Sequence, residues 1–427
     1  MAGPVPGRAG PLGLTGSLDY RALLKDVEKT LSAVEGGDDV LTTIAAVGEA
    51  AVRNFRAELG IAGGRLYVKE EADYVLSRGF GRSRKVVPGL RVASGYGPVR
   101  KAEEDGLVLT DLDDPSIDRD LEGKLGVTRF AAVSFGEQRF LLSFDVHPRV
   151  GAEDLLIALG IIRTVLDSKV KSDRLEGMLN DARRIQQSIL PRSMPAIADY
   201  EVFGQASPAE QVGGDFYDFL PVSERIFGAA IADASGHGLL AALLVRDVYV
   251  GLRMGIGGDL KISRTIERLN RIVNKSRLTT KFISLFYGEF EAGGEIIYVN
   301  AGHPGPLLFK AETGAFETLK STGLVLGPSP TATYGRRAVR MEPGDVMVLY
   351  TDGIVEATDR KGRELGVPRL KRLVSELRKR PARETVERIL AMVSAWSDGK
   401  APEDDRTVVV IRRTGKPPQA APGTTRP

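Results

Sequence analysis

Four acidic turns, separated by long stretches of chain, place the tightest constraint on how this sequence can fold. They read GGDFYD at 213–218, ADASGHG at 232–238, YTDG at 350–353 and EDDRT at 403–407. In three of the four, an apolar strand-like run directly abuts the acid. Carboxylates at the ends of strands that are distant in sequence can converge at one edge of a β-sandwich. We therefore predict a fold whose strand ends bring these turns together.

A cluster of carboxylates of this kind favours a metal site. It repels itself unless cations neutralise it, so its burial without metal is disfavoured. The chain has no cysteine and only 3 histidines, which points to oxygen ligands and to Mg²⁺ or Mn²⁺ rather than zinc. Two bridged ions can lower the pKa of a water and clamp the oxygens of an in-line phosphoryl displacement. One Asp-Gly turn alone is weak support, but the four in this order predict such a site.

Composition restricts the class of protein further. At 427 residues, with 42% apolar and 27% charged residues, the chain is long enough for two or three ordinary globular domains. A net charge of +3 gives no support for nucleic-acid binding, and the absence of cysteine removes disulfides and thiolate chemistry. The N-terminus lacks the apolar core of a signal peptide, and no run approaches the length of a membrane span. We therefore expect a cytoplasmic protein without a membrane span.

The sequence of the N-terminal part predicts an α+β module at 18–168. A Gly- and Pro-rich segment at 1–17 precedes this module and is expected to be disordered. Helices are expected at 18–34 and 40–59, two strands across 63–81, a loop, strand and loop at 99–116, and a hairpin at 130–147. A helix from Ala152 closes the module.

The order of these elements over residues 36–168 resembles a GAF domain, a small-molecule or protein-sensing fold. The resemblance rests on topology rather than on a motif, and a PAS-like fold is the competitor. It implies a sensor domain that receives a small ligand or an upstream activator, although no cysteine is present for a bilin chromophore. A dimerisation or protein-contact module without ligand is the alternative.

The closing helix continues past the module and carries two apolar seams. The first comprises Leu155, Leu159, Ile162 and Leu166, and the second comprises Leu175, Met178, Ala182, Ile185 and Ile189. Both have the alternating spacing of three and four residues that is typical of coiled coils, and the polar stretch 168–173 shifts the phase between them. We predict a helical, coiled-coil-like linker at 169–196, ended by Leu190-Pro191, and hence a homodimer. The alternative is a plain packed helix.

Residues 197–413 predict a second domain that is rich in strands, followed by a tail at 414–427 that is expected to be disordered. The segments IQQSILP, VGGDFYD, DASGHG, NAGHPGPLL, LYTDGIVEA and DDRTVVVI occur in this order between 185 and 411. With them, the domain resembles the metal-dependent serine/threonine protein phosphatases of the PPM type. Within that group it resembles the bacterial SpoIIE/RsbU branch, which acts in partner-switching control of sigma factors.

The resemblance implies an αββα sandwich with a two-metal centre at one edge. The predicted fold class is therefore α+β, with an αββα phosphatase domain preceded by a GAF-like domain and a helical connector. The helices expected at 238–254 and 260–277 follow the turn at Asp233, where this family uses helices as a regulatory switch. Our hypothesis is that the connector 155–190 packs on them and sets the position of Asp233 and Ala234. Its basis is the apolar face formed by Leu239, Leu240, Leu243 and Leu244.

Carried over motif by motif, the resemblance implies a set of metal-binding residues. The catalytic carboxylates would be those of Asp215, Asp233, Asp352 and Asp404, with Asp233 bridging the ions and the backbone carbonyl of Ala234 as a further ligand. Asp405 is the rival to Asp404, and whichever of the two does not ligate would order the loop. The candidate general-acid position of the eukaryotic branch holds Ser235 here, and no matching phosphate-gripping arginine is found. The protonation of the leaving oxygen is therefore open.

The remaining polar residues near the motifs are expected to be structural. Asp218 would support the site from outside the ligand set. His237 and His303 lie in glycine turns, where a histidine is more often a hydrogen-bonding group than a catalyst. Asn300 and the segment 302–304 would shape a turn near the substrate face.

The predicted function is Mn²⁺- or Mg²⁺-dependent dephosphorylation of a phosphoserine or phosphothreonine on a regulatory protein partner. By resemblance, that partner is an anti-sigma-factor antagonist. The alternative is a catalytically silent module of the same fold that sequesters the partner, although the presence of all four carboxylates argues against it. A third hypothesis takes DASGHG as the nucleotide lid of a Bergerat-type kinase, which would leave the YTDG and EDDRT turns unexplained.

Overall fold

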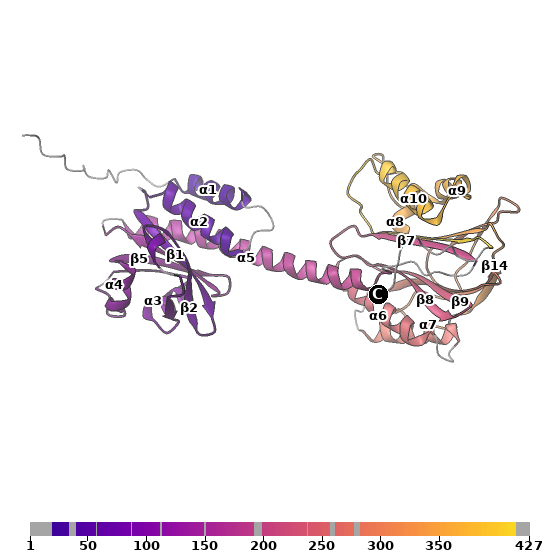
Figure 1. Ribbon diagram of the computed structural model, residues 1–427, viewed down its shortest axis with the longest axis horizontal. Helices are drawn as coiled ribbons and strands as arrows, with labels where there is room; N and C mark the ends of the chain where they lie inside the picture. The colour runs from indigo at the N-terminus through magenta and orange to yellow at the C-terminus, as the bar shows by residue number, and fades with distance from the viewer. Residues whose placement is uncertain are drawn as a thin grey trace, which may run out of the picture. The chain divides into compact units, whose positions relative to one another are not determined.

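The computed structural model describes residues 19–33, 40–56, 58–86, 88–111, 113–148, 151–191, 199–236, 238–256, 261–276 and 282–415. The chain divides into two units, Met1–Gly177 and Met178–Pro427, which Figure 1 shows. The segments predicted to be disordered lie outside the described residues, except for Thr414 and Gly415. No helix within the described ranges is long and apolar enough to cross a membrane.

The first unit is a six-stranded antiparallel sheet, ordered β3-β2-β1-β6-β5-β4, with helices on both faces (Figure 1). Its elements are α1 (Tyr20–Ala33), α2 (Val40–Asn54), β1 (Ile61–Glu70), β2 (Asp73–Gly81), the 3₁₀ helix η1 (Arg82–Lys85), β3 (Arg91–Ala93), α3 (Gly97–Asp105), β4 (Leu107–Asp111), α4 (Arg119–Leu125), β5 (Arg129–Phe135) and β6 (Phe140–Val146). Successive strand residues point to opposite faces. Leu66 of β1 therefore packs in the core beneath α1, α2 and α5, whereas Tyr67 packs in the core beneath α3 and α4.

The prediction of a loop at the start of 99–116 is wrong, because α3 occupies Gly97–Asp105. Pro98 lies in its first turn, where its fixed φ suits a helix start, and Gly106 ends it in the left-handed region at φ 83°. The helix buries Val99 and Ala102 against the sheet. Two apolar positions are too few to give a periodic signal, so tertiary packing decides the helix. The GAF-like assignment of this unit stays a prediction.

The connecting helix α5 (Ala152–Ile189) is continuous, and its two apolar seams have different surroundings. Leu155, Leu159, Ile162 and Leu166 are fully buried in the core of the first unit. Their side chains therefore cannot pack against a helix of a second chain. The first half of α5 is a plain packed helix. In the second seam, Leu175 is 62% exposed and Met178 63% exposed. A coiled-coil partner for the second seam stays a prediction.

We expect Leu159→Ala and Leu175→Ala to differ strongly in stability. The first opens a cavity in a packed core and should lower the free energy of unfolding by about 2–5 kcal/mol. The second removes a side chain that is exposed within a single chain, and it should cost less than about 0.5 kcal/mol in a monomer but more in a homodimer along the second seam. Urea denaturation of the two full-length variants, followed by circular dichroism, measures both. Equal losses would show that Leu175 is buried in a dimer.

The second unit contains two five-stranded antiparallel sheets, ordered β14-β11-β10-β9-β8 and β13-β12-β15-β16-β7. Its elements are β7 (Tyr200–Ser207), β8 (Asp215–Ser223), β9 (Ile226–Ala234), α6 (Leu239–Gly255), α7 (Ile262–Lys275), β10 (Ile283–Glu291), β11 (Glu295–Ala301), β12 (Leu307–Phe309), β13 (Phe316–Thr318), β14 (Arg337–Arg340), β15 (Val346–Tyr350), α8 (Asp352–Val355), α9 (Val367–Glu376), α10 (Ala382–Trp396) and β16 (Arg406–Arg413). The edge strand β14 and the short helix α8 were not predicted.

Three apolar cores hold four layers together in this unit. Residues such as Ile231 and Phe286 of the first sheet meet Leu349 and Val409 of the second sheet in the central core. The outer face of the first sheet packs on α6 and α7, and that of the second sheet packs on α9 and α10 (Figure 1). This arrangement is the αββα sandwich that the sequence predicted.

Candidate functional site

Asp215 and Asp233 lie opposite each other on the neighbouring strands β8 and β9. Directly opposed residues of an antiparallel pair have their Cβ atoms about 4.5–5.5 Å apart, so the two side chains share one face at one end of the sheet. Burial raises the pKa of Asp215 well above its usual value, and the charge of Asp233 raises it further. The Thr351 hydroxyl donates a 2.8 Å hydrogen bond to Asp215 Oδ2. This bond links the first sheet to the end of β15 in the second sheet.

Asp233 lies among several acidic side chains. Its pKa rises to about 7, first because of burial and then because of the charges of Asp352, Asp404, Asp405 and Glu356. Asp352 opens α8 directly after β15, and Asp404 and Asp405 directly precede β16. Since β15 and β16 are antiparallel neighbours, the end of β15 and the start of β16 place these acids at one end of the second sheet. The acidic turns therefore meet at one end of the sandwich.

Asp404 and Asp405, the rivals for one ligand role, make different contacts. The Asp405 side chain is buried, and its Oδ1 accepts a 2.7 Å hydrogen bond from the Ala209 N–H. Its Oδ2 accepts a 2.5 Å hydrogen bond from the Gly214 N–H. Asp404 is exposed, and its Oδ1 accepts from the N–H of Asp405 at 2.8 Å. Asp405 thus orders the loop that precedes Asp215.

The glycines of the motifs allow the backbone to approach these groups closely. A Cβ atom on Gly213 would lie 2.4 Å from Asp405 Oδ2, and one on Gly353 would lie 2.1 Å from the carbonyl oxygen of Asp405. A Cβ atom on Gly214 would lie 2.7 Å from the carbonyl oxygen of Ala234. The Ala234 N–H in turn donates a 3.0 Å hydrogen bond to the Gly214 carbonyl. Glycine is therefore required where the acidic turns pack against one another.

The C-terminal end of α5 is tied to the same loop by Gln186. Its Nε2 donates to the Gly213 carbonyl oxygen at 2.5 Å, and its Oε1 accepts from the Gly213 N–H at 3.0 Å. Ile189 and Leu190 pack against the core that includes α6. The exposed side of α6, with Leu239, Leu240 and Leu243, is about half accessible. The connector thus reaches the site through the loop at Gly213. Of the four leucines that the hypothesis invoked, Leu244 is buried in the core beneath α6, and the other three stay about half accessible.

The acidic cluster fits a hard divalent cation by its chemistry. Its oxygen-only donors suit Mg²⁺ or Mn²⁺. Burial raises the pKa of Asp215 and Asp233 most, and the neighbouring acidic charges add a repulsion that a cation would relieve. Within the described ranges, however, no three or more His, Asp or Glu side chains are arranged to hold a metal ion. The ligand roles expected for these carboxylates and for Ala234 therefore stay predictions.

Asp218 lies away from the other carboxylates and pairs with α6. Arg253 donates to both of its carboxylate oxygens, at 2.8–3.0 Å, while the Asp218 side chain is almost fully buried. Burial raises the pKa of Asp218, and the Arg253 charge acts in the opposite direction. The pair fastens α6 to β8, which is a structural role.

His303 is buried and structural. Its Nδ1 lies 2.7 Å from Ser284 Oγ, and its backbone N–H donates a 2.8 Å hydrogen bond to Asn300 Oδ1. Burial lowers the pKa of His303 to about 3, so the imidazole is neutral near pH 7. Asn300 also donates to the His303 carbonyl oxygen at 3.1 Å, which closes the predicted turn. His237 lies outside the described residues.

Three side chains at the site were not predicted to contribute. Thr351 binds Asp215, Gln186 binds the Gly213 backbone, and the charge of Glu356 raises the pKa of Asp233. All three lie in the quoted motifs IQQSILP and LYTDGIVEA. The signal was present in the sequence, but a linear motif does not show which distant group each side chain contacts.

The sequence of the second unit matches known proteins. Residues 223–414 match the family described as Stage II sporulation protein E (SpoIIE), in a segment that begins after Asp215. The chain is 30% identical over 233 residues to the phosphoserine phosphatase RsbU of Bacillus subtilis, covering 54% of this chain and 69% of that protein. The chain belongs to the SpoIIE/RsbU family of PPM-type protein phosphatases.

This SpoIIE-family phosphatase is also similar to a longer protein and to a solved structure. It is 27% identical over 282 residues to Protein IcfG of Synechocystis sp., covering 59% of this chain and 44% of IcfG. The chain thus spans less than half the length of that relative. The chain also resembles the crystal structure of the RsbU and RsbW domains of a Mycobacterium tuberculosis protein. The sequence identity is 24% and the TM-score is 0.48, and the match covers 54% of this chain and 64% of that one.

The neutral, buried His303 predicts a particular pH dependence of stability. Its folded-state pKa of about 3 lies below the unfolded value of 6.5. Between these values the unfolded chain binds more protons, so the free energy of unfolding should fall as the pH drops from 6.5 towards 3. In His303→Gln, which cannot titrate there, the fall between pH 6.5 and 5 should be smaller. Identical pH dependence in urea denaturation, or an imidazole NMR titration near pH 6.5, would contradict this.

Proposed function

We propose that this phosphatase removes phosphate from a phosphoserine or phosphothreonine of a regulatory protein, with two divalent cations as cofactors. The observation that carries the proposal is the crowding of acidic side chains around Asp233, whose pKa it helps to raise to about 7. The acidic residues around Asp233 lie within residues 223–414, which match the SpoIIE family, and the chain is 30% identical over 233 residues to a phosphoserine phosphatase. The partner we propose is an anti-sigma-factor antagonist, the substrate class implied by the resemblance to the RsbU branch.

The proposed ligands of the cations are Asp215, Asp233, Asp352 and Asp404, together with the carbonyl oxygen of Ala234. Both carboxylate oxygens of Asp405 already accept backbone N–H groups, which favours Asp404 as the ligand. Bound Mg²⁺ or Mn²⁺ would supply an activated water and neutralise charge on the phosphoryl group.

The chain's own residues hold these carboxylates in place before any cation binds. Thr351 fixes one oxygen of Asp215 by its 2.8 Å hydrogen bond, and the Thr351 hydroxyl also accepts from the Thr407 N–H at 3.0 Å. Asp405 fixes the backbone before Asp215. Such supports orient ligands and raise the affinity of a metal site.

A substitution at Asp352 tests the reaction. We expect the full chain to release phosphate from a phosphoserine protein only with Mn²⁺ or Mg²⁺. Asp352→Asn should reduce this by more than about 100-fold, because a charged ligand matters more than the outer partners, whose loss costs roughly 10- to 100-fold. Asp398→Asn is the matched control, since Asp398 is a surface residue paired with Arg360, and it should keep full activity.

The catalytically silent partner-binding module is the alternative. Failure of the wild-type chain to release phosphate with either metal would overturn the enzymatic proposal and favour that module. Retention of activity in Asp352→Asn would overturn the ligand assignment instead.

We also propose that the first unit acts as a sensor that controls turnover through α5, and that the chain forms a homodimer along the second seam. Support for the control comes from Gln186, whose amide is bonded twice to Gly213, next to the Gly214 N–H that binds Asp405. A shift of α5 along its axis would therefore move the loop that carries Asp215.

The Gln186 contact can be tested by two neighbouring substitutions. Gln186→Met removes both hydrogen bonds and should weaken Mn²⁺ activation or turnover by about tenfold, since each bond contributes roughly 0.5–1.5 kcal/mol. Gln187→Met changes an exposed neighbour on the same helix and should leave both unchanged. Equal Mn²⁺ titration curves for the two variants would contradict the coupling.

A further inference from the structure

Two exposed apolar side chains, those of Phe282 and Leu324, lie in the second unit near the acidic turns. Phe282 is 42% exposed and Leu324 is 63% exposed. All 15 phenylalanines of the chain lie within the described ranges, and Phe282 is the only one of them that is exposed. Large apolar residues are mostly buried, and aromatic residues are enriched where protein surfaces meet. This pair is therefore a candidate contact for another protein.

The register of the strands places Phe282 beside the acidic cluster. In the antiparallel pair β9 and β10, Asp233 lies opposite Ser284. Phe282 stands two positions before Ser284, and its carbonyl oxygen accepts a 2.9 Å hydrogen bond from the Ser235 N–H. The Phe282 N–H in turn donates to Ser235 Oγ at 2.9 Å. Since neighbouring strands lie about 4.8 Å apart, Phe282 is one strand away from Asp233 at the same end of the sheet.

Leu324 lies one strand spacing further along this end. Leu326 and Ile283, the first residue of β10, exchange two backbone hydrogen bonds at 2.8 and 3.0 Å. Gly323 forms a bridge with Ala301, the last residue of β11. The short segment that carries Leu324 is therefore fixed on both sides of it. It lies two strand spacings, roughly 10 Å, from β9.

A protein substrate of the phosphatase comes within reach of this pair, which we call the apolar rim (Phe282 and Leu324). A phosphoserine whose phosphate meets the acidic cluster brings its neighbouring residues over the same end of the sheet. An extended chain advances about 3.3–3.6 Å per residue, so three residues span the roughly 10 Å between β9 and the segment with Leu324. Because the backbone of the apolar rim is already fixed, its side chains lose little freedom on binding.

We propose that the apolar rim binds an apolar side chain within three residues of the phosphoserine, and thereby selects protein substrates with apolar residues at these positions. This inference rests on the proposed function. Contact with the apolar rim removes apolar surface of both partners from water, which is the main driving force in most protein association. A polar side chain at the same place would lose water without gaining a hydrogen bond, because the side chains of Phe282 and Leu324 offer none.

Steady-state kinetics of the full-length chain with Mn²⁺ test this selection on three probes. The first is p-nitrophenyl phosphate, which is too small to reach the apolar rim from the acidic cluster. The others are two phosphoserine heptapeptides that carry either leucine or asparagine two and three positions away on both sides of the phosphoserine. We expect kcat/KM for the leucine peptide to exceed that for the asparagine peptide by about tenfold or more, since a few apolar contacts dominate most protein interfaces.

Two substitutions and a matched control locate the contact. Phe282→Ser and Leu324→Ser should each lower kcat/KM for the leucine peptide about tenfold more than for p-nitrophenyl phosphate. The control Ile297→Ser changes a side chain of the same sheet that is 38% exposed and lies four positions from the end of β11 at Ala301. It should leave the kinetics with all three probes unchanged. A merely structural role of the apolar rim would lower turnover of every probe equally.

The outcomes separate clearly, provided that circular dichroism shows each variant to be folded as the wild type is. The inference is overturned if the two peptides react equally or not at all while p-nitrophenyl phosphate is hydrolysed. It is also overturned if Phe282→Ser and Leu324→Ser behave as Ile297→Ser does, or lower all turnover equally. A change of molar mass by light scattering in the rim variants would assign the apolar rim to a contact between two copies of the chain and overturn it as well. If no probe is hydrolysed with Mn²⁺ or Mg²⁺, the proposed function itself fails, and this inference fails with it.

Discussion

Repulsion between buried carboxylates is the constraint on which the second unit depends. Asp215 and Asp233 lie opposite each other at strand ends, and Asp352, Asp404 and Asp405 add further negative charge. Burial raises the pKa of Asp233 most, and the like charges around it raise that pKa further, to about 7. A fold that retains such an arrangement must hold the turns together by other means.

Those means are backbone hydrogen bonds and glycine. Asp405 binds two N–H groups of the loop before Asp215, and Thr351 binds Asp215 itself. Gly213 and Gly353 let these groups approach closely because they have no Cβ atom. The result is a rigid loop network at the ends of both sheets. Gln186 joins α5 to this network, which offers a physical route from the connector to the acidic cluster.

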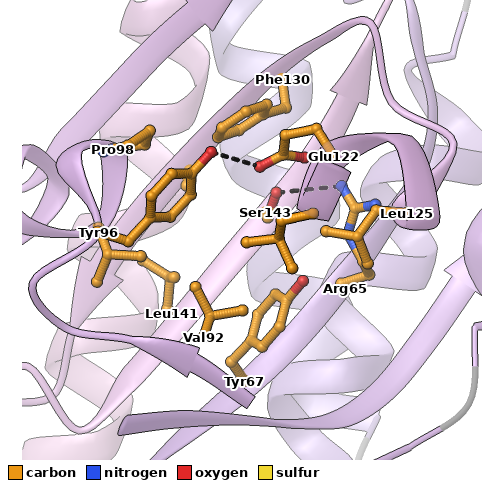
Figure 2. A pocket seen from close by; sticks show the side chains of 13 residues that line it. Arg65, Tyr67, Val92, Tyr96, Pro98, Glu122, Leu125, Phe130, Leu141 and Ser143 are labelled. Carbon is orange, nitrogen blue, oxygen red and sulfur yellow. Dashed lines mark hydrogen bonds between the residues drawn. The ribbon is translucent and has the colours of Figure 1, made fainter. Parts of the chain in front are cut away.

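The first unit uses buried charge differently. Arg65 and Glu122 are both inaccessible, and both line one small space between the sheet and the pair α3 and α4 (Figure 2). In the second unit the loop N–H groups of Ala209 and Gly214 are bound by Asp405, and negative charge gathers around Asp233. In the first unit Asp145 balances the charge of Arg65. The Nε and Nη1 atoms of Arg65 and the Oε2 atom of Glu122, however, have no hydrogen-bond partner among the described residues.

The sequence by itself determined most strands and helices of both units, and its resemblance to the PPM-type phosphatases implied the αββα class of the second. Strand alternation, helical periodicity and Asp-Gly turns are local signals, so they can be read from a few neighbouring residues. It also named the acidic residues that meet at one end of the sandwich. Local signals failed at α3, where Pro98, Val99 and Ala102 are the buried residues and the sheet supplies the stabilisation.

Only the tertiary structure decided which contacts these residues make. Asp404 and Asp405 are adjacent in the sequence, and nothing local separates them. Asp405 orders the loop because it reaches Ala209, which is 196 positions away. In the same way, the first seam of α5 has coiled-coil spacing, but the sheet of its own unit buries it. Burial and hydrogen-bond partners depend on residues that are distant in sequence, and no pattern along the chain encodes that distance.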